Sequence, residues 1–213
     1  MVRSRGRGAL AFEDFLTLPR DSIPVLESLQ LSVIQDFLVP NLSIPDSNFG
    51  VFRGAARLRR IDMIPRWDRS SVYFPMNLGL CWPQLTHINF EGIPIQVSIA
   101  HELMKLCTSL HNCVLHLMTD GRVKVAFPVA GIHLPRLQKL FVKEAGPDPN
   151  ILAKFIRPQV LPALQDFDLY LERTSLADIA PIIEDWSTSR GPARSRLNYA
   201  GRHLAEIGYI YPS

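Results

Sequence analysis

Residues 134–143 read Leu-Pro-Arg-Leu-Gln-Lys-Leu-Phe-Val-Lys, and this stretch decides the fold. It contains the pattern Leu-x-x-Φ-x-Φ, where Φ is an apolar residue, and a proline stands two residues before the first leucine of the pattern. Because side chains alternate between the two faces of a strand, Φ-x-Φ is typical of a short strand with one buried face. Proline fixes its own φ near about −65° and pushes its predecessor towards extended geometry, so it ends any helix that precedes the strand.

The same pattern occurs six times along the chain. The copies are Leu26/Leu29/Leu31, Leu58/Ile61/Met63, Leu85/Ile88/Phe90, Leu110/Cys113/Leu115, Leu137/Leu140/Val142 and Leu164/Phe167/Leu169. Their first leucines are 32, 27, 25, 27 and 27 residues apart, and Pro24, Pro83 and Pro162 precede three more of them as Pro135 precedes Leu137. A period of about 20–29 residues is typical of leucine-rich repeats. The spacing therefore predicts about six such repeats.

Helical patterns fill several of the intervals. Apolar spacing predicts a helix over residues 98–110, Asn150 can cap a short helix over 150–155, and Ser175 with Asp178 forms a capping box ahead of a third. The sequence thus predicts an α/β fold: a leucine-rich-repeat solenoid with a parallel concave sheet and irregular convex helices.

The predicted organisation has three parts. Residues 1–15 form a flexible basic N-terminus, 16–189 form the repeat domain, and 190–213 form a C-terminal cap or tail. Within the last part, Leu204/Ile207/Tyr209 is a degenerate further copy of the pattern.

Composition excludes several classes of protein. Hydrophobic residues make up 47% of the chain and charged residues 20%, which argues against disorder, and 17 prolines argue against a helical bundle. The net charge of +3 is concentrated in arginine clusters at 53–69 and 190–202. These clusters lack interleaved aromatic residues and any nucleic-acid motif, so they favour solvated faces over nucleic-acid binding. We expect no membrane segment, and three cysteines indicate a reducing compartment, cytoplasmic or nuclear.

Motifs for catalysis and metal binding are weak. The sequence has no G-x-S-x-G, no glycine-rich phosphate loop and no H-E-x-x-H, so it predicts a non-enzyme without cofactors or catalytic residues. Potential zinc ligands crowd one region: His101, Cys107, His111, Cys113 and His116. Strand alternation puts Cys113 and His116 on opposite faces, which argues against a metal site. A cation at Asp166, Asp168 and Glu172 is also less favoured than a solvated or laterally paired face.

The positions between the apolar residues of each strand predict an exposed ladder on the concave face, in three columns across the sheet. The first column is Ser28, Arg60, His87, Asn112, Lys139 and Asp166, the second is Gln30, Asp62, Asn89, Val114, Phe141 and Asp168, and the third is Ser32, Ile64, Glu91, His116, Lys143 and Tyr170. The predicted protein-binding residues of this ladder are Arg60, His87, Asn89, Glu91, His116, Lys139, Phe141, Lys143, Asp166, Asp168 and Tyr170. Phe141 and Tyr170 would be the aromatic anchors, since aromatic residues contribute strongly to interfaces. Lateral pairs are expected between Lys139 and Asp166 and between Glu91 and His116. A merely soluble sheet face with such pairs remains the alternative.

Three stretches carry a resemblance to a known family: residues 49–58 (Phe-Gly-Val-Phe-Arg-Gly-Ala-Ala-Arg-Leu), 82–88 (Trp-Pro-Gln-Leu-Thr-His-Ile) and 106–110 (Leu-Cys-Thr-Ser-Leu). With the repeated pattern, residues 15–172 resemble the leucine-rich-repeat region of the F-box proteins that are expanded in mushroom-forming, basidiomycete-type fungi. The resemblance implies a protein-binding module that recognises substrates for an SCF-type ubiquitin ligase.

The chain departs from that family near its N-terminus. An F-box would bind a Skp1-type adaptor, but the Leu18-Pro19 pair that could start one is followed within seven residues by Leu26. An adaptor is therefore expected only if an F-box belongs to a longer gene product. The alternative is a stand-alone leucine-rich-repeat scaffold, or a truncated fragment, with no ligase role.

Overall fold

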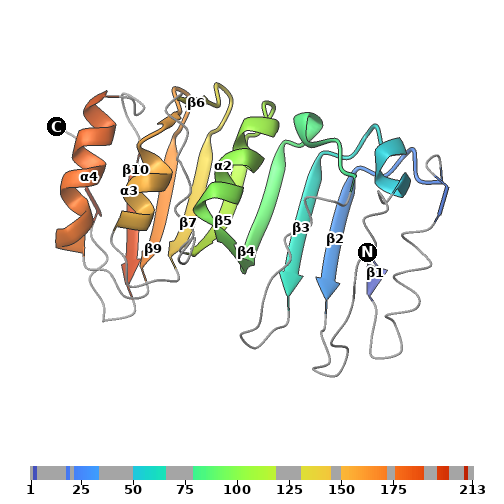
Figure 1. Ribbon diagram of the computed structural model, residues 1–213, viewed down its shortest axis with the longest axis horizontal. Helices are drawn as coiled ribbons and strands as arrows, with labels where there is room; N and C mark the ends of the chain where they lie inside the picture. Colours follow the sequence, from blue (N-terminus) through green and yellow to red (C-terminus); the bar gives the residue numbers. More distant parts are fainter. Residues whose placement is uncertain are drawn as a thin grey trace.

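The chain folds as an α/β protein around one long β-sheet (Figure 1). The computed structural model describes residues 2–3, 18–19, 22–33, 50–65, 79–118, 131–144, 150–171, 176–189, 196–201 and 209–210. The nine strands lie in the order β1 (Val2–Arg3), β2 (Ser28–Val33), β3 (Arg60–Pro65), β4 (His87–Gln96), β5 (Asn112–Met118), β7 (Lys139–Glu144), β9 (Asp166–Leu171), β10 (Arg196–Gly201) and β11 (Tyr209–Ile210). All neighbours are parallel except β10 and β11. The predicted α/β class and parallel sheet are therefore confirmed.

Six of these strands, β2, β3, β4, β5, β7 and β9, are the ones that the repeated pattern predicts. Each begins two residues after the first leucine of its copy, as β7 begins at Lys139 after Leu137. Their order in the sheet follows the chain without reversal. A short second sheet pairs β6 (Ile132–His133) with β8 (Gln159–Val160), again in parallel.

A tight turn precedes each of the six strands. The leucine N–H donates to the carbonyl three residues earlier, at 3.0 to 3.3 Å, for Leu26, Leu58, Leu85, Leu110, Leu137 and Leu164. Proline occupies the second position of four of these turns, where its fixed φ suits the turn. In the copy at Leu85 the proline lies in the 3-10 helix η3 (Trp82–Gln84). The prolines therefore act where the sequence predicts, between the preceding segment and the strand.

A second set of hydrogen bonds links each turn to the next. The carbonyl of the residue after the leucine accepts two N–H groups from the following copy: Arg59 O accepts from Thr86 at 2.8 Å and His87 at 3.0 Å. The same two bonds recur with the carbonyls of Glu27, Thr86, His111 and Gln138 as acceptors. Because these bonds lie where the strands start, they set the register of each parallel pair before the ladder begins.

The helices lie in the intervals between strands. They are η1 (Gly50–Gly54), α2 (Val97–Leu106), α3 (Asn150–Ile156) and α4 (Leu176–Ser189). The prediction over 98–110 was too long at its end, because residues 107–110 form the turn that starts β5 and the Cys107 N–H already closes the helix on Leu103 O. The capping residue Ser175 lies outside the described residues.

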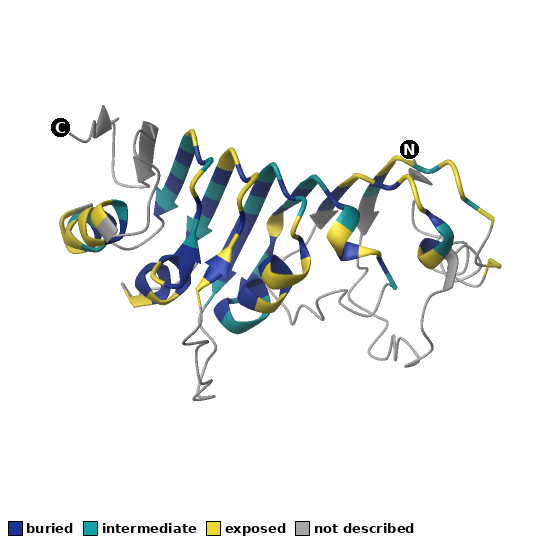
Figure 2. Ribbon diagram, turned by 90° about the horizontal axis from the view of Figure 1, so that it is seen from above, coloured by how far each residue is buried: buried dark blue, intermediate teal, exposed yellow. Residues whose placement is uncertain are grey.

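All of these helices lie on one side of the sheet (Figure 2). The strand residues that face them are buried, as the pattern predicts: Leu29, Ile61, Met63, Ile88, Phe90, Cys113, Leu115, Leu140, Val142, Phe167 and Leu169. Leucines of the turns and the inner faces of α2 and α3 complete one continuous core. Burying an aliphatic side chain of this size stabilises the fold by about 1.5–3 kcal/mol. The helix side of the sheet therefore supplies most of the stabilisation that comes from apolar burial.

The two ends of the sheet lie within the predicted N-terminal and C-terminal parts of the chain. β10 adds a parallel strand beside β9, with Arg196 opposite Asp166, inside the part predicted as a cap or tail. Tyr209 lies in β11, which is antiparallel to β10, while Leu204 and Ile207 lie outside the described residues. Of the basic N-terminus predicted to be flexible, Val2 and Arg3 are described, and they pair with β2 as β1.

Candidate protein-binding surface

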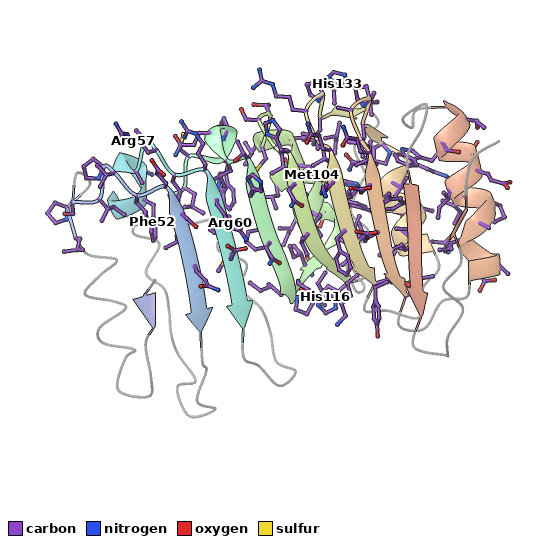
Figure 3. All side chains as sticks on the ribbon, turned by 180° about the vertical axis from the view of Figure 1, so that it is seen from behind. Phe52, Arg57, Arg60, Met104, His116 and His133 are labelled. Atoms are coloured by element: carbon purple, nitrogen blue, oxygen red, sulfur yellow. The ribbon has the colours of Figure 1, made fainter. Side chains whose placement is uncertain are left out.

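The face of the sheet opposite the described helices is here called the open face, and Figure 3 views the molecule from this side. Of its predicted binding residues, Arg60, Glu91 and Lys139 are exposed, His116 is buried, and His87, Asn89, Phe141, Lys143, Asp166, Asp168 and Tyr170 are half-buried. The alternating burial of β9 and β7, in which every second residue is buried, places the remaining ones outward.

Two of the predicted columns across the sheet are confirmed by the strand register. The first runs through Ser28, Arg60, His87, Asn112, Lys139 and Asp166, each opposite the next. The second runs through Gln30, Asp62, Asn89, Val114, Phe141 and Asp168 in the same way. Strands in a sheet are about 4.8 Å apart, so neighbours within a column can touch.

The third column is wrong at β4. His116 lies opposite Pro94, not Glu91, because the register shifts between Phe90 and Pro94. Glu91 and Gly92 are both exposed at this bulge, and the Glu91 N–H donates to Asn89 Oδ1 at 3.1 Å. The expected pair between Glu91 and His116 is therefore not a lateral neighbour pair. Beyond the bulge the column resumes as predicted from His116 to Lys143 and Tyr170.

Ion pairs join charges on the open face. Lys139 Nζ lies 3.2 Å from Asp166 Oδ2, as predicted for this neighbouring pair. Arg60 holds Asp62 with two hydrogen bonds, from Nε at 2.7 Å and from the second guanidinium nitrogen, Nη2, at 3.2 Å. The hydrogen bond and the charge of Asp62 raise the pKa of Arg60. Asp62, which the column placed on the surface, is largely buried beneath this contact.

The two predicted aromatic anchors lie on neighbouring strands. Phe141 on β7 is half-buried between Val114 and Asp168 in the second column. Tyr170 on β9 lies beside Lys143, whose Nζ is 5.5 Å from the ring centroid. This is a cation–π geometry. Both rings therefore offer apolar surface at one end of the open face.

His87 has a defined tautomer. Thr86 Oγ1 donates to Arg59 O at 3.1 Å, so its single proton is used, and the 2.8 Å contact with His87 Nδ1 requires Nδ1–H as the donor. Partial burial, then the charges of Arg60 and His111, lower the pKa of His87, and Asp62 offsets part of this. The ring is therefore neutral near pH 7, with Nε2 as an acceptor.

The potential zinc ligands lie in different environments. His101 on α2 is fully buried, stacks on Phe155 with centroids 5.7 Å apart, and bonds through Nε2 to Phe155 O at 3.1 Å. Cys107 and Cys113 are buried thiols; burial raises the pKa of Cys107 to about 12 and that of Cys113 further. Across the described part of the chain, no group of three or more His, Cys, Asp or Glu is placed to hold a metal. Glu172, of the acidic cluster, lies outside that part.

Two features of the surface were missed by the sequence reasoning. The Gly92 and Pro94 residues inside an apparent strand are a signal for the bulge, since both weaken regular ladders. The hydrogen-bond chain from His87 through Thr86 to the preceding copy had no sequence signal, because it depends on the position of a carbonyl 27 residues away.

Comparison with protein-family models, with curated proteins and with solved structures finds no match for the chain. None of the described helices is both long and apolar enough to cross a membrane.

Proposed function

We propose that the chain is a leucine-rich-repeat solenoid that acts as a non-catalytic protein-binding module, with the open face as its binding surface. The observation that carries this proposal is the division of the strand residues into a helix-covered apolar face and a polar face with two aromatic rings. The recurring turn and the strand order along the chain support the repeat assignment, because each copy makes the same bonds to the next.

The family resemblance extends the proposal. Within it, the open face recognises substrates of an SCF-type ubiquitin ligase, and a Skp1-type adaptor joins only if an F-box belongs to a longer gene product. The second candidate is a stand-alone scaffold that binds a partner without any ligase. Co-purification with a Skp1-type adaptor, for the chain alone and with any in-frame upstream sequence, discriminates between the two.

Capture of partner proteins tests the module itself. Phe141→Ala and Tyr170→Ala remove the two aromatic anchors, and we expect each to reduce recovery of the captured proteins at least tenfold, about 1.4 kcal/mol. Leu106→Ala is the matched control, because Leu106 is an apolar residue on α2, 41% exposed, on the helix side of the sheet.

The variants are compared at equal folded fraction, measured by circular dichroism. Retention of the same captured proteins by folded Phe141→Ala and Tyr170→Ala would exclude the open face as the binding surface. If only Leu106→Ala reduced the recovery of captured proteins, the binding surface would lie on the helix side of the sheet.

A further inference from the structure

Charges of the open face neutralise one another at two places. The Lys139–Asp166 pair spans β7 and β9 at 3.2 Å, and the Arg60–Asp62 pair lies along β3 at 2.7 Å. A charged partner would compete with these contacts and would have to desolvate groups that are already paired. The face as a whole therefore offers little net attraction for a strongly charged ligand.

Lys143 and Asp168 do not change this balance. Lys143 lies over the ring of Tyr170, and Asp168 also has an interaction partner. The charged residues at both ends of the face are thus engaged before any partner arrives, whereas Glu91, at the bulge of β4, is exposed.

Between the two ion pairs lies a group of uncharged, half-buried side chains, here called the neutral centre. It consists of His87, Asn89, Asn112, Val114 and Phe141. The strand register makes it contiguous: His87 is opposite Asn112, and Val114 is opposite both Asn89 and Phe141.

The polar members of the neutral centre present both donors and acceptors. His87 donates through Nδ1 to Thr86, which leaves Nε2 as an acceptor. Asn89 uses its Oδ1 for the Glu91 N–H, which leaves its amide hydrogens as donors. Asn112 supplies one more side-chain amide, with a donor and an acceptor. This set complements the N–H and C=O groups of an amide.

The apolar members are adjacent. Val114 on β5 and Phe141 on β7 are direct neighbours in the register and both are half-buried, so part of each side chain is open to a ligand. Neighbouring strands are about 4.8 Å apart, and the two side chains together match the width of one aliphatic or aromatic side chain.

We propose that the neutral centre binds an extended, uncharged segment of a partner polypeptide. One apolar side chain of the segment packs on Val114 and Phe141, and amide groups flanking it bond to His87 and Asn112. The inference rests on the proposed protein-binding function and names the chemistry of the ligand. A nucleic acid is disfavoured because its phosphates need unpaired cations along their path, whereas Lys139 and Arg60 are paired.

Fluorescently labelled short peptides test the proposal against the purified full chain. Three sets share length and one central leucine or phenylalanine, and they differ in their flanking residues: Asn, Gln and Ser in the neutral set, Asp and Glu in the acidic set, Lys and Arg in the basic set. A labelled single-stranded oligonucleotide is the fourth probe. Fluorescence anisotropy measures each dissociation constant at low and at high salt.

We expect the neutral set to bind most tightly, with less than a twofold change in affinity between the two salt concentrations. Phe141→Ala should weaken this binding about tenfold, because it removes the apolar seat. Asn112→Asp keeps the shape of the side chain but replaces its amide donors with a carboxylate opposite Lys139, and it should weaken binding by a similar factor. Leu106→Ala on the helix side should leave the affinity unchanged.

Acidity provides a second measurement. Protonation turns His87 Nε2 from an acceptor into a donor. Because partial burial lowers the pKa of His87, the affinity for the neutral set should fall only as the pH drops below about 6.5, the ordinary imidazole value. The groups that face His87 are Arg60 and Asp62 from β3, Thr86 beside it, and His111 from the turn before β5. His87→Gln keeps a side-chain acceptor without a titrating proton, so this variant should lose the pH dependence.

The outcomes separate this inference from the proposed function. Tightest binding of the acidic set, the basic set or the oligonucleotide, sensitive to Phe141→Ala, overturns the neutral ligand while the open face keeps its role. If no peptide binds but Phe141→Ala still abolishes the capture of whole partner proteins, the ligand is a folded surface and not an extended segment. Failure of the peptides with capture unaffected by Phe141→Ala overturns both.

Discussion

The two faces of the sheet are built from alternate residues of the same strands, yet they differ in burial and in the residue types that occupy them. On β7, Leu140 is 1% exposed against the helices, while its neighbour Phe141 is half-buried on the open face. The inner positions vary among Leu, Ile, Val, Met, Phe and Cys, whereas the outer ones include charged, amide, hydroxyl, histidine and aromatic residues together with Val114. The inner face thus contributes stability through buried apolar side chains, whereas the outer positions can vary in charge and polarity.

Thiol reactivity gives the largest expected contrast between buried and exposed positions. Cys81 is exposed, whereas Cys107 and Cys113 are buried on the helix side. The pKa of Cys107 is raised to about 12 by burial, so thiolate is scarce at mildly alkaline pH as well. We expect a disulfide reagent to modify Cys81 about a thousandfold faster than the other two, since those react only after local opening.

The control for this prediction is the same protein in guanidinium chloride, where all three thiols should react at similar rates. A Cys81→Ser variant should lose the fast phase completely. Rapid reaction of Cys113 in the native protein would mean that the inner face of β5 is accessible to the reagent, which would contradict the burial of the helix side of the sheet.

Substituting the adjacent residues Leu140 and Phe141 on β7 compares the contributions of the two faces to the free energy of unfolding. Leu140→Ala removes a buried side chain from a closely packed core, so it should lower the free energy of unfolding by about 2–5 kcal/mol. Phe141→Ala removes a larger side chain from the open face and should cost about 1 kcal/mol or less. Denaturant unfolding of both variants measures the difference, and equal losses would show that Phe141 belongs to the core.

A buried polar contact on the helix side should have a smaller effect. His101→Phe retains a ring to stack on Phe155 but loses the hydrogen bond to Phe155 O, which Gln159 Nε2 still contacts at 3.2 Å. We expect a loss of about 1 kcal/mol in the free energy of unfolding. Glu102→Ala, at the exposed neighbour on α2, should be close to neutral. A stabilised His101→Phe variant would show that packing outweighs this bond.

The pairing register of the six strands could be predicted from the sequence, because each copy of the pattern contains its own turn and its own alternation of apolar and polar residues. The leucine, the proline before it and the two apolar residues after it are local features, and the bonds between turns then align consecutive strands. The first two columns of the open face follow directly from that alignment.

The rest of the sheet depends on features that lie outside the pattern. β10 was missed because Arg194, two residues before this strand in the sequence, stands where the other copies have leucine. The bulge after Phe90 shifted one column because three extra residues enter β4 before Pro94. The tautomer of His87 depends on contacts between copies. Sequence spacing thus predicted the sheet face but not how its polar atoms are used.

The smallest expected effect concerns the ion pair of Lys139 and Asp166. Its side chains are 60% and 27% exposed, so a double-mutant cycle with Lys139→Ala and Asp166→Ala should give a coupling of about 0.2–1 kcal/mol that falls with salt. The Arg60–Asp62 pair is the control: its carboxylate is only 11% exposed and accepts two bonds, so its coupling should be larger and less sensitive to salt. A zero coupling for Lys139 and Asp166 at low salt would leave a lysine on the open face available to an acidic partner. The inference of a neutral ligand depends on this coupling energy. A carboxylate of a partner that bound Lys139 would first have to replace Asp166, so it would gain only the difference between its own interaction with Lys139 and that of Asp166. Even a small favourable coupling therefore reduces the attraction for an acidic partner.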